Sequence, residues 1–175
     1  MHSHNTIVGL RRGAQTIVAS TGVRTSSADL ILRHRSNLLH KTAVSGVLLA
    51  CTAPEAQTSI LLQVLNQELE SKADLRSAGL SLSRHILGQP ALRERYFEAI
   101  LASRNFLAVL NHSGDLVEPD EGFVALGVCA QVASGVLKAL LLHSNLSGEE
   151  IVRESLVIAG QIKRPGHEEV SLEVL

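Results

Sequence analysis

Residues 6–21 read TIVGLRRGAQTIVAST, in which two β-branched runs flank a short segment that contains a glycine. β-Branched side chains favour strands, and glycine tolerates the backbone of a tight turn. The segment Arg12-Gly13-Ala14 therefore predicts the turn of a β-hairpin, and the fold is predicted to begin with two antiparallel strands.

A second strand pair and a helix are predicted next along the chain. Residues 37–39 and 43–49 are apolar enough for strands, with His40-Lys41 near their turn. Thr52, followed by a proline and a glutamate, predicts the N-terminal cap of a helix. Apolar residues at three- and four-residue steps extend this helix to Ser71.

The remaining elements follow the same alternation of strands and helices. Asp74 begins a second helix, which ends near the glycine and proline of residues 88–90. Ser147 and Glu150 form a capping-box pattern at the start of a later helix. Strands are predicted over 98–102, 106–110, 116–117 and 123–126, with a turn at 111–115; helices over 129–143 and 147–162; and an edge strand over 170–175.

Runs of strands that alternate with pairs of helices indicate helix layers stacked on antiparallel sheets. The order predicts an α+β protein with a four-layer α/β/β/α sandwich. No repeat, low-complexity segment or linker interrupts the chain, so we expect one domain over residues 6–175, preceded by a short leader over residues 1–5.

The composition excludes several classes of protein. A net charge of −1 argues against nucleic-acid binding, which needs a clustered basic surface. No apolar run is long enough to cross a bilayer, and the N-terminus lacks the pattern of a signal peptide, so we expect no membrane partner and a cytoplasmic location. Cys51 and Cys129 lie in apolar surroundings and are interpreted as core residues.

An ordered set of short motifs resembles the HslV family, the proteolytic subunits of the HslUV ATP-dependent protease. The resemblance is colinear and covers nearly the whole chain. The motifs are Thr6-Ile7-Val8 followed by Arg11-Arg12 and Gly22; Ser45-Gly46 with Thr52-Ala53; Gly114-Asp115-Leu116-Val117-Glu118-Pro119; Ala125-Leu126-Gly127; and the segment from Leu146-Ser147 to Ala159-Gly160.

The resemblance implies the fold of N-terminal nucleophile hydrolases, also called the proteasome-subunit fold. In this family an N-terminal threonine attacks a peptide carbonyl, and its own α-amine serves as the base. The resemblance also implies a homo-oligomeric double ring of six- or seven-fold symmetry, protein or peptide substrates, and an AAA+ unfoldase partner of the HslU type. This chain has no glycine-rich phosphate loop, so ATP is expected to act only through that partner.

Carried over residue by residue, the family's catalytic positions are mostly substituted. The nucleophile position is Asn5, because the spacing from Thr6 to the arginine pair is ungapped. The supporting aspartate falls on Thr21 and the supporting serine on Val128. The lysine position falls within Arg33, His34 and Arg35, and an arginine stays protonated where a lysine relays a proton. The resemblance therefore implies a subunit with impaired or lost catalysis.

Alternatives remain open at this stage. Cleavage after Asn5 would expose Thr6 as a nucleophile shifted by one residue, and a misregistered start is a further reading. A different class of function is a non-catalytic ring scaffold that pairs with an active paralogue. A third is another amide hydrolysis on the same fold.

The resemblance also implies a cation site near the end of the last long helix. In the family, a loop there binds a monovalent or divalent cation through backbone carbonyls. The corresponding positions are Gly160, Lys163 and Gly166, for which Na⁺ or Mg²⁺ is the expected ion.

Overall fold

The computed structural model describes residues 5–21, 23–24, 34–35, 38–72, 74–163 and 169–175. Two antiparallel sheets form its centre. The first has the order β10-β1-β2-β11 and the second the order β5-β6-β7-β8-β9, while β3 and β4 pair separately. The strands are β1 (Thr6–Arg12), β2 (Gln15–Thr21), β3 (Val23–Arg24), β4 (His34–Arg35), β5 (Leu39–Lys41), β6 (Val47–Cys51), β7 (Glu98–Ser103), β8 (Phe106–Asn111), β9 (Leu116–Val117), β10 (Phe123–Gly127) and β11 (Val170–Val174).

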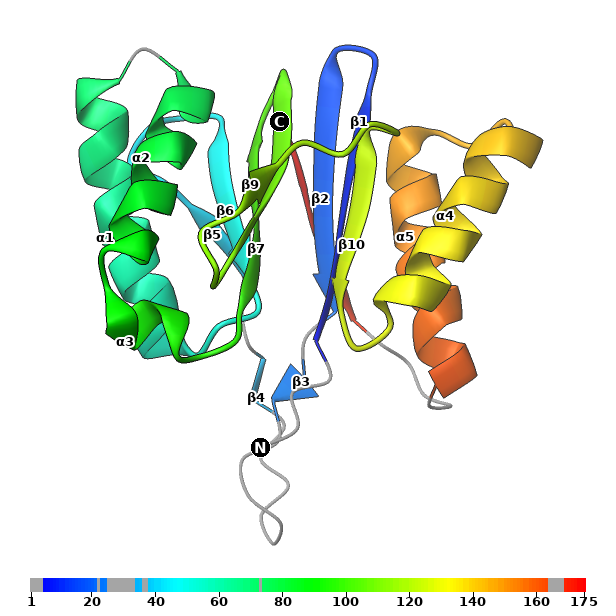
Figure 1. The fold of residues 1–175 in the computed structure, drawn as a ribbon. Coiled ribbons are helices and arrows are strands. Elements are labelled where there is room, and N and C mark those ends of the chain that lie inside the picture. The colour runs from blue at the N-terminus through cyan, green and yellow to red at the C-terminus, as the bar shows by residue number, and fades with distance from the viewer. Residues whose placement is uncertain (1–4, 22, 25–33, 36–37, 73, 164–168) are drawn as a thin grey trace, which may run out of the picture.

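Helices cover the outer face of each sheet, as Figure 1 shows. One pair packs on the second sheet, and the other pair packs on the first sheet. The order from side to side is thus helix layer, sheet, sheet, helix layer, and the predicted α/β/β/α sandwich is confirmed. The helices are α1 (Glu55–Ser71), α2 (Leu75–Leu87), the short α3 (Pro90–Arg93), α4 (Ala130–His143) and α5 (Gly148–Lys163).

The N-terminal hairpin supplies side chains to two different core layers. Its turn includes Gly13, whose φ is 62°. Because successive strand residues point to opposite faces, Ile7 enters the layer between the sheets while Val8 enters the layer beneath α4 and α5. Val18 and Ala19 of β2 divide in the same way. The alternation at the start of β1 determines which way each candidate site residue points.

Two local expectations were wrong. The second strand pair turns later than expected: His40 and Lys41 lie within β5, and the chain turns between Thr42 and Gly46, whose φ is 76°. Thr52 does not cap α1. Its hydroxyl donates instead to the carbonyl of Glu98 on β7, at 3.0 Å, so a contact between strands replaces the local cap.

Other helix boundaries agree with the sequence. Asp74 caps α2 by accepting from the N–H of Ser77 at 2.8 Å. The first helix ends at Ser71 as expected, and its buried apolar stripe includes Leu61 and Leu65. None of the described helices combines the length and the apolarity that crossing a bilayer requires.

The capping box at the start of α5 is formed as expected. Ser147 donates its N–H and its hydroxyl to the carboxylate of Glu150, and the N–H of Glu150 donates back to the Ser147 hydroxyl. The side-chain bond and then the backbone bond from Ser147 hold the pKa of Glu150 below its ordinary value. The folded state therefore favours the carboxylate form of Glu150.

Ser147→Ala is expected to lower the midpoint of thermal unfolding by about 2–4 °C at neutral pH. Because the folded pKa of Glu150 is depressed, the carboxylate's contribution is complete above the unfolded-state pKa and is lost as pH falls through the folded value. The difference between the variant and the parent should therefore narrow in acid, while the loss of the bond from the Glu150 N–H to the Ser147 hydroxyl keeps part of it at every pH. Thermal melts at several pH values check this, and an equal difference at all pH values would contradict it.

Candidate functional site

The predicted nucleophile region lies at one end of the first sheet, where β1 begins and β2 and β10 end. Thr6 is paired with Thr21 on β2 and with Gly127 on β10. Figure 1 shows β3 and β4 beyond this same end of the sheets. The fold therefore brings Asn5, Thr6, Thr21 and Val128 into one neighbourhood, as the resemblance implies.

Backbone groups that follow β10 hold the start of β1. The N–H of Val128 donates to the carbonyl of Asn5 at 3.0 Å. The N–H of Cys129, the residue that precedes α4, donates to the Thr6 hydroxyl oxygen at 3.2 Å. Asn5 is thus bound into the end of the sheet, and the Thr6 hydroxyl already accepts a bond from the α4 N-terminus.

Gly127 makes this close approach possible. Its φ is 92°, a conformation that side chains other than glycine's rarely adopt. A Cβ at this position would lie 2.0 Å from the carbonyl oxygen of Asn5. Sequence reasoning used Gly127 only as part of a motif and missed this role, because the requirement arises from the pairing of β1 with β10.

Strand alternation separates the candidate residues into two groups. Thr6 shares a face with Val8, toward α4 and α5, and the bond from Cys129 agrees with that direction. Thr21, directly opposite Thr6, lies on the same face. Asn5 shares a face with Ile7, toward the layer between the sheets. The hydroxyl of Thr6 therefore does not occupy the place of a side chain at position 5.

Asn5 is the chemically unusual member of the group. Only 2% of the residue is exposed, and neither its amide nitrogen nor its amide oxygen has a hydrogen-bond partner among the described residues. Burying such an amide without a partner is costly. A carboxamide is also a poor nucleophile, and the nitrogen of Thr6 is tied up in the peptide bond to Asn5, so no free α-amine stands beside the Thr6 hydroxyl.

The other predicted positions contribute less. Arg33 lies outside the described residues, and Arg35 is placed only by its backbone pairing with Val23. Val128 is 41% exposed and brings an aliphatic side chain to the position where the resemblance implies a supporting serine. None of the described positions to which the resemblance assigns a supporting group carries a lysine, aspartate or serine.

The predicted cation positions lie at the end of α5. Gly160 and Lys163 belong to the last turn of this helix, and Gly166 lies outside the described residues. The last four carbonyls of a helix lack intrahelical donors and carry the negative end of the helix dipole, which fits a cation. No cluster of three or more His, Cys, Asp or Glu residues suited to a metal is found in the described part of the chain. The cation site stays a prediction.

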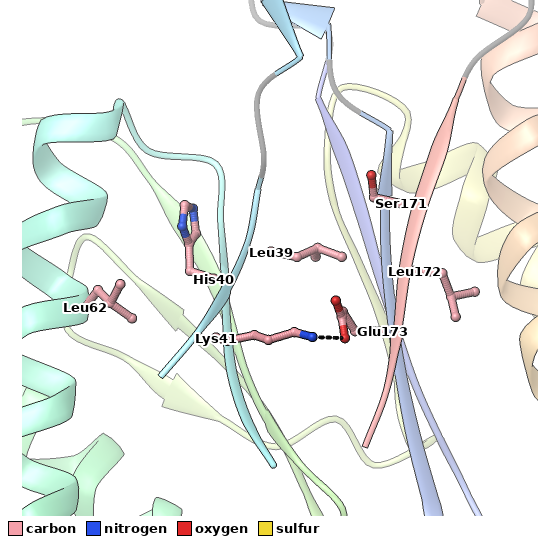
Figure 2. A pocket seen from close by; sticks show the side chains of 7 residues that line it. All are labelled: Leu39, His40, Lys41, Leu62, Ser171, Leu172 and Glu173. Atoms are coloured by element: carbon pink, nitrogen blue, oxygen red, sulfur yellow. Dashed lines mark ion pairs between the residues drawn. The ribbon is translucent and has the colours of Figure 1, made fainter. Parts of the chain in front are cut away.

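A cleft of about 410 Å³ opens at a lateral edge of the sandwich, between β5 and β11 (Figure 2). None of the predicted site residues lines it. An ion pair between Lys41 and Glu173, with 2.9 Å from nitrogen to oxygen, spans the two strands. The residues that line the cleft are Leu39, His40, Lys41, Leu62, Ser171, Leu172 and Glu173.

Comparison with known proteins agrees with the fold and with a resemblance that covers nearly the whole chain. No protein-family model matches the chain. The chain is 27% identical to the ATP-dependent protease subunit HslV of Desulfovibrio desulfuricans over 177 aligned residues, covering 100% of both chains. The HslV proteins of Syntrophobacter fumaroxidans and Caldicellulosiruptor saccharolyticus are also 27% identical, over 90% and 93% of this chain and 88% and 93% of their own.

A solved structure shares the same fold. The crystal structure of eukaryotic HslV from Trypanosoma brucei superposes with a TM-score of 0.83 at 22% identity, covering 97% of this chain and 98% of that chain. The chain thus has the α+β sandwich of the N-terminal nucleophile hydrolases. Along nearly its whole length its sequence is similar to that of HslV proteins, at 27% identity.

Proposed function

We propose that this chain is a ring-forming subunit of an HslUV-type, ATP-dependent protease particle, and that it does not itself act as a threonine peptidase. The curated relatives that it matches along 88–100% of their length are named ATP-dependent protease subunits. By that likeness the particle is a cytoplasmic double ring that works with an AAA+ unfoldase, which supplies the ATP chemistry. Protein and peptide chains are its substrates.

The observation that supports the proposed loss of catalysis is the hydrogen bonding and the burial of Asn5. Its carbonyl is hydrogen-bonded to Val128, and its amide side chain is buried where the family presents a nucleophilic hydroxyl. An amide at this position neither attacks a carbonyl nor provides a base. Among the described site residues, Thr21 and Val128 add no group that titrates near neutral pH, so neither of them supplies a general acid or base.

Removal of residues 1–5 would not simply restore the site. It would free the α-amine of Thr6, but the hydroxyl of Thr6 lies on the helix face of the sheet, toward Cys129. A one-residue shift along a strand exchanges its two faces. The shifted threonine would have to rotate the end of β1 to reach the layer between the sheets.

Two measurements on the purified protein test this proposal. Intact-mass analysis should find a chain that retains Asn5, and hydrolysis of a fluorogenic peptide should equal that of the Thr6→Ala variant. Thr42→Ala, a change at a half-buried threonine in the turn between β5 and β6, is the matched control. A mature chain that begins at Thr6 and loses its peptidase activity in Thr6→Ala alone would contradict the proposal.

A mixed ring is the second candidate function. The sandwich is kept over the whole chain while the site positions are substituted, as expected of a scaffold that contributes walls and contacts. Co-purification with a second HslV-type chain that keeps an intact Thr-Thr start would support this candidate. Homogeneous rings from the native source would count against it.

A further inference from the structure

We draw no further inference here: the strongest candidate, the cleft between the edge strands β5 and β11, carries none, because its Lys41 and Glu173 charges already pair with each other and nothing in the described part of the chain shows what fills it.

Discussion

Gly127→Ala is expected to lower the free energy of unfolding by about 3–5 kcal/mol, the largest loss among the substitutions considered for this chain. A residue other than glycine at a φ of 92° carries backbone strain of about 1–3 kcal/mol. The added Cβ would also lie 2.0 Å from the carbonyl oxygen of Asn5. The obstructing atom is backbone, so β1 and β10 must separate there. The bond from Val128 to Asn5 is then lost, which costs about 1–3 kcal/mol more.

Gly135→Ala is the matched control for this change. Gly135 lies within α4, and a Cβ there meets nothing within 4 Å. Alanine is the better helix former, so the control should gain about 0.5–1 kcal/mol. Urea unfolding of the two variants and the parent measures both effects. A Gly127→Ala protein as stable as its parent would mean that Asn5 does not lie against β10 in solution.

Most of the architecture could be predicted because the local patterns agree with the tertiary fold. The hairpin of β1 and β2 follows from β-branched runs around Gly13, and α2 follows from the Asp74 cap. The predictions that were wrong concern residues whose contacts are made with a strand far away in the sequence. Thr52 has the local pattern of a helix cap, yet its hydroxyl donates a hydrogen bond to the carbonyl of Glu98, which is far away in sequence.

The candidate site could be predicted in part for the same reason. Ungapped spacing places Asn5 at the nucleophile position, and strand alternation already separates Asn5 from Thr6. The bonds from Val128 and Cys129 depend on the pairing of β1 with β10, which no local pattern specifies. The burial of Asn5 has the same origin. The register of β1 against β10 thus explains why the backbone of Asn5 lies against Gly127.

Asn5→Leu is expected to raise the free energy of unfolding by about 1–3 kcal/mol. Leucine has the same number and branching of side-chain heavy atoms as asparagine, so the change alters polarity more than shape. Both polar atoms of the Asn5 amide are buried without a partner among the described residues, and leucine has no such atoms to desolvate. The bond from Val128 to the backbone carbonyl is kept. Chemical unfolding monitored by circular dichroism measures the gain.

Asn5→Asp provides the opposite test at the same position. Asn5 is 2% exposed, and a carboxylate buried to the same extent carries a larger desolvation cost than the amide. The variant should therefore be less stable than the parent at neutral pH. It should recover stability in acid, where the carboxylate is protonated. If Asn5→Leu instead destabilises the chain, a partner satisfies the amide in solution, and the site holds a polar group or water. If leucine stabilises the chain, the buried amide of Asn5 lowers the free energy of unfolding. Such a cost to stability is expected at a position inherited from a catalytic centre.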